Sequence, residues 1–153
     1  MLQIPYIKEL QAESEGKTTV EEGQVISCHT VESWKEQLQL AEESKKLVVV
    51  HFTASWSGTC HVIAPVLADL AKKLPNVTYL KVDVDELKTV AEEWNVEAMP
   101  TFIYLKEGNL IDKVVGAKKD ELQQRIVLTN LVHKYEIELV FYCFNFVSET
   151  RIS

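Results

Sequence analysis

The stretch that decides the fold lies at residues 47–60, which read LVVVHF (47–52) followed by TASWSGTC (53–60). The first six residues are almost continuously apolar and β-branched, which is typical of a strand covered on both faces. Ser57 is a good helix N-cap, and the pattern after it predicts a helix over 57–73. Pro65 lies inside that helix, so we expect a kink there.

The rest of the chain alternates in the same way. Thr30 is a candidate N-cap, and Gly108 begins a hairpin turn. Strands are predicted at 24–28, 77–82, 101–105 and 110–115, and helices at 31–43, 86–94 and from 118 onward. Alternation gives a parallel core, and the closing hairpin adds antiparallel strands. The predicted fold class is therefore α/β, with a central mixed sheet of about five strands and helices on both faces.

Composition and charge narrow the classes of function. The chain has 153 residues, 46% of them hydrophobic, which suffices for one ordinary core. A net charge of −7 disfavours nucleic acid and anionic membranes as partners. No apolar run is long enough to span a bilayer. The start lacks a secretory pattern, and three widely spaced cysteines (Cys28, Cys60 and Cys143) favour a reducing compartment. We expect a protein of a reducing compartment that binds neither nucleic acid nor membrane.

Both ends of the chain differ in composition from the middle. Residues 1–20 are polar and rich in glutamate, and we expect a flexible arm there. Residues 21–132 are predicted to form the domain, followed by a tail over 133–153. Within that tail, residues 137–147 are apolar, aromatic and nearly uncharged. This segment either folds back on the domain or adds no function, and we favour the second interpretation.

Five segments together resemble a known family. They read EEGQVISCHTV (21–31), VVVHFTASW (48–56), VDVDEL (82–87), AMPTF (98–102) and DKVVGAKKDEL (112–122). The chain from about residue 22 to 124 resembles the plant h-type thioredoxins nearly residue for residue, whereas both tails fall outside the resemblance. The resemblance implies a thioredoxin fold and a cytosolic protein-disulfide reductase that uses no bound cofactor or metal. Its implied partners are protein targets and an NADPH-dependent thioredoxin reductase.

Three positions depart from the family pattern where the chemistry takes place. The family motif Trp-Cys-Gly-Pro-Cys reads Trp-Ser-Gly-Thr-Cys here, so Ser57 stands at the position of the nucleophilic cysteine and Thr59 at that of the proline. Cys60 is the retained second cysteine, which we expect to be largely covered. His51 stands at the family's buried aspartate, near Lys81. Two like charges in a poorly hydrated place repel, so we expect a neutral His51, either functional or a tolerated core residue.

The resemblance also implies a groove for substrate. Trp56 and Gly58 keep their family places, Met99 and Pro100 match the loop with a cis-proline, and Gly116 matches the third wall. The backbone of Met99 is implied to pair with an extended substrate segment. Trp56 has a simpler alternative interpretation as a loop aromatic that only packs. We expect a thioredoxin h-like protein with weak or no dithiol turnover; the alternative is a non-catalytic protein that holds extended polypeptide in this groove.

Two other chemistries have little support in the sequence. Ser57 and His61 are one helical turn apart, but no third orienting group or Gly-x-Ser-x-Gly motif accompanies them. His51, Cys60 and His61 lack the spacing of a metal site. The acidic residues at 83, 85 and 86 are interpreted as a solvated strand exit.

Overall fold

The computed structural model describes residues 23–150, so the expected arm at 1–20 lies outside the described residues. In chain order the elements are β1 (Val25–Cys28), α2 (Val31–Ser44), β2 (Leu47–Thr53), α3 (Gly58–Lys73), β3 (Thr78–Asp83), α4 (Lys88–Glu93), β4 (Thr101–Lys106), β5 (Asn109–Val115) and α5 (Lys119–Thr150). Every strand and helix predicted within this range is present. Thr30 caps α2 by accepting a hydrogen bond from the Ser33 amide at 3.1 Å, and α3 continues across Pro65.

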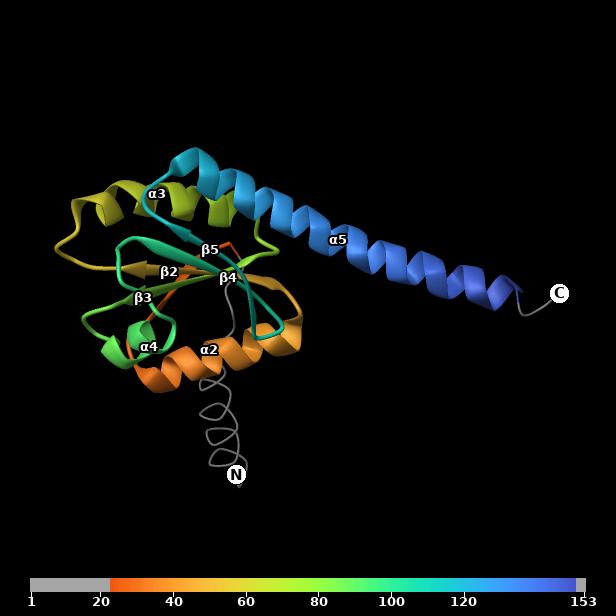
Figure 1. Ribbon diagram of the computed structural model, residues 1–153, viewed down its shortest axis with the longest axis horizontal. Coiled ribbons are helices and arrows are strands. Elements are labelled where there is room, and N and C mark those ends of the chain that lie inside the picture. Colours follow the sequence, from red (N-terminus) through yellow and green to blue (C-terminus); the bar gives the residue numbers. More distant parts are fainter. Residues whose placement is uncertain (1–22, 151–153) are drawn as a thin grey trace, which may run out of the picture.

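The five strands form one mixed sheet in the order β1-β3-β2-β4-β5. β1, β3 and β2 are parallel, whereas β4 and β5 run antiparallel to their neighbours. Figure 1 shows α3 and the first part of α5 on one face of the sheet, with α2 and α4 on the other. The predicted thioredoxin fold, with helices on both faces of a mixed sheet, is confirmed.

Strand β2 lies at the centre, and all seven of its residues are buried. Its side chains alternate between the two cores, as a strand requires. Leu47 and Val49 join the core under α3 and α5, and Val48, Val50 and Phe52 join the core over α2 and α4. The continuous apolar run in the sequence therefore reflects burial on both faces.

Several strands end or begin at the same edge of the sheet. Thr53 of β2 pairs with Asp83 of β3, Phe52 pairs with Thr101, and Thr101 pairs with Val115. The ends of β2, β3 and β5 and the start of β4 therefore lie together. The loops that follow or precede these strands carry the residues singled out in the sequence.

Helix α4 is shorter than predicted. It begins at Lys88 rather than near residue 86. The Asp85 amide donates to Asp83 Oδ1 at 2.8 Å, and the Leu87 amide donates to the Asp83 carbonyl at 3.0 Å. These bonds hold residues 83–87 in a turn, because a short acidic side chain competes for local backbone donors.

Helix α5 continues beyond the predicted domain boundary at residue 132. Leu122 and Ile126 are buried in the core, but the helix continues to Thr150 and runs past the body of the protein (Figure 1). The segment 137–147 therefore does not fold back on the domain, and the expected boundary at residue 132 falls within this helix. In the described part of the chain, no helix is both long and apolar enough to cross a membrane.

Candidate functional site

The first turn of α3 is built around the Ser57 side chain. Ser57 is the N-cap, and its Oγ accepts a hydrogen bond from the Cys60 amide at 3.4 Å. The same Oγ lies 2.9 Å from the Thr59 hydroxyl, and the Ser57 amide donates to the Ala54 carbonyl at 3.1 Å. Free N–H groups and the helix dipole make such a position electropositive. A serine fits the cap, so the helix forms without a cysteine there.

Cys60 lies in the first turn of α3 and is 2% exposed. This low exposure agrees with the expectation that the Cys60 side chain is largely buried. Cys28 on β1 is also a free, buried thiol, and burial raises its pKa. A buried thiol is shielded from attack on another molecule's disulfide.

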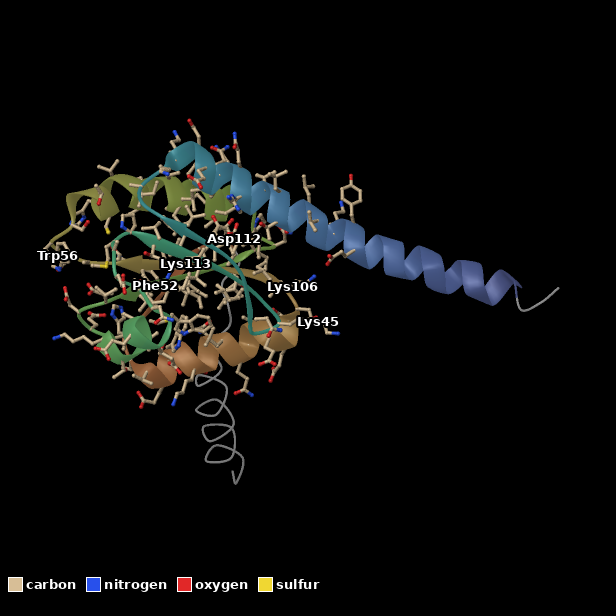
Figure 2. All side chains as sticks on the ribbon, viewed as in Figure 1. Lys45, Phe52, Trp56, Lys106, Asp112 and Lys113 are labelled. Carbon is tan, nitrogen blue, oxygen red and sulfur yellow. The ribbon has the colours of Figure 1, made fainter. Side chains whose placement is uncertain are left out.

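Trp56 projects from the loop between β2 and α3. Its side chain is 69% exposed, and it lies at the end of the molecule opposite to the direction in which α5 projects (Figures 1 and 2). The indole Nε1 donates to Asp85 Oδ2 at 3.0 Å. This bond orients an exposed aromatic ring. The sequence suggests only a solvated strand exit for Asp85. The structure shows in addition that Asp85 positions the Trp56 ring.

The loop before β4 lies at the same edge of the sheet. The Met99–Pro100 peptide bond is cis. The Gly116 amide donates to the Pro100 carbonyl at 2.9 Å, which ties the end of β5 to this loop. Gly116 has φ of +105°, a backbone conformation that favours glycine. The strand register thus brings Met99, Pro100 and Gly116 to the edge from which Trp56 and Gly58 also emerge.

His51 is a buried histidine of the central strand. It is 1% exposed and stacks on Phe102 with ring centroids 4.8 Å apart. Its Nε2 has no hydrogen-bond partner. Burial, and secondarily the Lys81 charge, lower its pKa to about 4. This lowered pKa agrees with the expected neutral His51. Desolvation is its main cause, and the Lys81 side chain, which is exposed to solvent, contributes less.

The alternative chemistries gain no support from the geometry. His61 Nε2 lies 2.9 Å from the Ser55 carbonyl, which can only accept, so the ring nitrogen donates there and does not act as a base for Ser57. Among the described residues, no group of three or more histidine, cysteine or acidic side chains could hold a metal ion. Sequence reasoning missed the contacts of Asp85, Thr59 and His61. Only the pairing of β2 with β3, which places Asp85 beside the loop, could have indicated the first.

The family model that matches the chain is that of thioredoxin, over residues 25–127. The chain belongs to the thioredoxin family. It is 74% identical over 106 residues to an h-type thioredoxin of Ricinus communis, a match that covers 69% of this chain and 90% of the relative. Thioredoxin H1 of Arabidopsis thaliana is 73% identical over 106 residues, covering 69% and 93%. A crystal structure of a thioredoxin from Nicotiana alata matches with a TM-score of 0.67 at 42% identity, covering 72% of this chain and 96% of that one. The chain is therefore an α/β protein of the plant h-type thioredoxin group.

The buried His51 of this thioredoxin predicts a specific loss of stability in acid. The unfolded histidine binds a proton near its ordinary pKa of 6.5, whereas the folded one stays neutral until about pH 4. Lowering the pH through this window therefore favours the unfolded state, by about 1.4 kcal/mol per pH unit and roughly 3 kcal/mol in all. Urea unfolding of the wild type and His51→Leu at each pH measures the difference. A difference that does not change between pH 6.5 and 4 would contradict the assignment.

The cover over Cys60 predicts slow reaction with a thiol reagent. Native protein should label at Cys60 far more slowly than urea-unfolded protein, because the reagent reaches the sulfur only after local opening. Peptide mapping after timed labelling identifies the site and separates Cys60 from the other two cysteines. Labelling of Cys60 at equal rates in native and unfolded protein would show an accessible thiol.

Proposed function

We propose that this thioredoxin h-like protein has weak or no turnover as a dithiol reductase. The observation that carries the proposal is the side chain at the start of α3, where the Ser57 hydroxyl occupies the N-cap. The resemblance places the family's nucleophilic cysteine at this position. The lineage is that of protein-disulfide reductases, and this member lacks the thiol that their reaction uses first.

The family reaction needs two sulfurs. A thiolate at position 57 attacks one sulfur of a target disulfide, forms a mixed disulfide and releases the other target sulfur as a thiolate. Cys60 then attacks the mixed disulfide, releases the second target thiol and closes a disulfide with position 57. Two electrons have then passed to the target, and an NADPH-dependent reductase restores the pair. Serine forms no disulfide, so the first step has no nucleophile at this position.

The two other substitutions bear on how far the lost chemistry can be restored. Thr59 replaces the family's proline and binds the Ser57 hydroxyl instead of stiffening the loop. His51 replaces an aspartate that assists proton transfer at the second cysteine, and a neutral histidine supplies no negative charge there. Restoring the cysteine alone should therefore give less activity than a family member with all three residues.

The alternative function is binding without electron transfer. The exposed Trp56 ring is held by Asp85, and the Gly116 amide holds the Pro100 loop at the same edge. These features survive without the nucleophile. In this function the groove of Trp56, Gly58, Met99, Pro100 and Gly116 would hold an extended polypeptide of a target protein through strand-like backbone contacts. We place either activity in the cytoplasm, with no nucleic acid or membrane as partner.

The turnover proposal is tested by insulin reduction with thioredoxin reductase and NADPH. Wild type should consume NADPH at the background rate, and Ser57→Cys should raise the rate clearly above it but below that of an h-type thioredoxin with the full motif. Ser57→Ala is the matched control, because it also removes the hydroxyl without adding a thiol. Steady consumption by the wild type at a family-like rate would overturn the proposal.

The groove proposal is tested by titrating extended peptides from disulfide-containing target segments, followed by backbone amide shifts. Binding should be weak, because a short strand contact buries little area. Trp56→Ala should weaken it about fivefold to thirtyfold through the lost aromatic contact. Leu110→Ala, which removes another exposed side chain at the far end of β5, should leave it unchanged. If the shifts cluster away from the groove, or Trp56→Ala has no effect, the binding function is wrong.

A further inference from the structure

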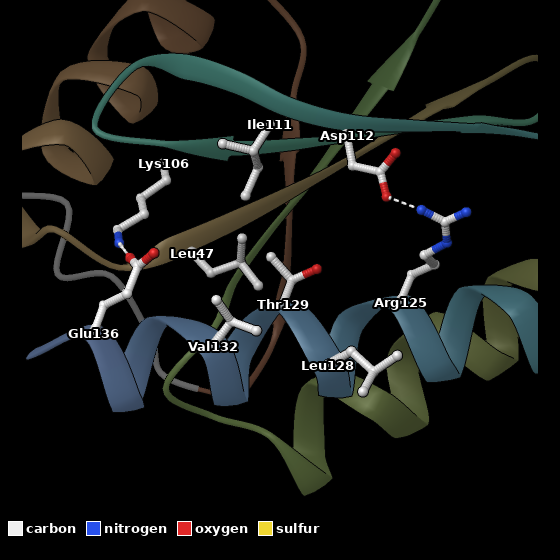
Figure 3. Close-up of a pocket in the computed structure, with 9 residues that line it drawn as sticks. All are labelled: Leu47, Lys106, Ile111, Asp112, Arg125, Leu128, Thr129, Val132 and Glu136. Atoms are coloured by element: carbon white, nitrogen blue, oxygen red, sulfur yellow. Dashed lines mark hydrogen bonds and ion pairs between the residues drawn. The ribbon is translucent and has the colours of Figure 1, made fainter. Parts of the chain in front are cut away.

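The outer part of α5 exposes an unusual set of apolar side chains. Leu128, Leu131, Val132 and Tyr135 are between 44% and 63% exposed, within barely two helical turns. Figure 3 shows Leu128 and Val132 beside a groove that also borders Leu47. The core-facing residues Leu122 and Ile126 are completely buried, so this exposure begins where the helix leaves the sheet.

The sequence continues the same face to the end of the helix. Apolar residues occupy positions 128, 132, 135, 139, 142 and 146, and these are Leu, Val, Tyr, Leu, Tyr and Phe. The spacing of 4, 3, 4, 3 and 4 residues is the heptad pattern of helices that pack side by side. We call these six positions the α5 stripe. It covers nearly three heptads, or roughly 28 Å at 1.5 Å per residue.

The outer part of α5 has no neighbouring element among the described residues. Its backbone points away from the sheet and from the other described helices (Figure 1). Long helices in water owe most of their stability to packing of an apolar face rather than to intrinsic propensity. A helix that continues to Thr150 therefore needs a partner surface for this part.

We propose that the α5 stripe pairs with the same stripe of a second copy, so that the protein is a homodimer through its C-terminal helix. A heptad stripe is self-complementary, because two equal helices can interlock their apolar residues about a two-fold axis. This pairing goes beyond the redox or binding function and does not depend on it. It also replaces our expectation that segment 137–147 adds no function.

The surface area that two α5 stripes would bury against each other is large enough for a stable dimer. Three of its six residues are aromatic, and a buried aromatic side chain contributes about 150–250 Å². The aromatic residues of two copies therefore contribute roughly 900–1,500 Å², before the leucines and valines are added. Stable interfaces bury about 1,200–2,000 Å² in total. A single helix thus carries enough surface without help from the domain.

The near absence of charge along the α5 stripe favours an uncharged partner surface, such as the same stripe of a second copy. Residues 137–147 include one charged residue, Glu138. Glu136, next to the stripe, is paired with Lys106 of its own domain at 3.1 Å, and Arg125 with Asp112 at 2.6 Å. Figure 3 shows both pairs on the groove side. The acidic chain therefore presents little unpaired negative charge along this face to repel a second copy.

The dimer would leave the proposed binding groove open. Trp56 lies at the end of the domain opposite to the projecting part of α5 (Figure 2). Two domains joined through their outer helices therefore keep both grooves facing solvent. The pairing and the groove can be tested separately.

The test is the mass of the full chain in solution, by sedimentation equilibrium or light scattering over a wide range of concentrations. We expect twice the 17.5 kDa chain mass, falling to 17.5 kDa on dilution. The double variant Tyr135→Lys with Leu139→Lys places charges on the stripe and should raise the dissociation constant roughly a hundredfold or more. The matched control, Gln123→Lys with Val127→Lys, adds the same charge at exposed positions off the stripe and should stay dimeric. Circular dichroism checks that all variants remain folded.

Several results would overturn the proposal. One is a wild type that stays monomeric at every concentration. Another is a dimer that the stripe variant leaves intact, or that the control breaks equally. The third is a monomer whose residues 1–22 cross-link to the stripe, which would identify the chain's own start as the cover. The last is a monomer that associates instead with uncharged phosphatidylcholine vesicles in a way that depends on the stripe.

Discussion

The pairing of β2 with β3 on one side and β4 on the other fixes nearly everything else in this molecule. Because both neighbours are bonded along its whole length, β2 is buried throughout and its register cannot slip without moving apolar residues between the two cores. That register sets where the chain leaves the sheet after Thr53, and so where α3 begins. It also brings the Pro100 loop and the end of β5 to the same edge.

At position 57 the fold and the family's redox chemistry need different side chains. Helix α3 needs an N-cap, and a serine oxygen supplies it by accepting from the Cys60 amide. Disulfide exchange needs a thiolate at the same place, which no serine supplies. One substitution can therefore leave the helix, the Trp56 loop and the neighbouring edge in place while removing the proposed electron transfer. Membership of the h-type thioredoxin group is consequently evident in the fold, whereas the proposed loss of turnover follows first from the missing sulfur at position 57.

Most of the fold could be predicted from the sequence, because its signals are local. The β-branched run at 47–52, the caps at Thr30 and Ser57 and the hairpin turn at Gly108 each indicate an element without reference to the rest of the chain. The extension of α5 could not be predicted in this way, because the nearly continuous apolar run at 137–147 does not by its spacing distinguish a helix from a strand. The hydrogen bond between Trp56 and Asp85 and the desolvation of His51 depend on contacts between distant segments, so they required the three-dimensional structure.

The most direct measurement is covalent capture of a disulfide-containing target peptide, read by intact mass without any reductase. The wild type should form no mixed disulfide at position 57 or at Cys60 while folded, since Ser57 has no sulfur and Cys60 is covered. Peptide mapping separates these two positions from Cys143. The variant Ser57→Cys with Cys60→Ser should trap the peptide as a stable adduct at position 57, because the attacking thiol is present and the resolving one is not. A native wild type that forms the adduct at Cys60 would contradict the conclusion that this site has lost its nucleophile.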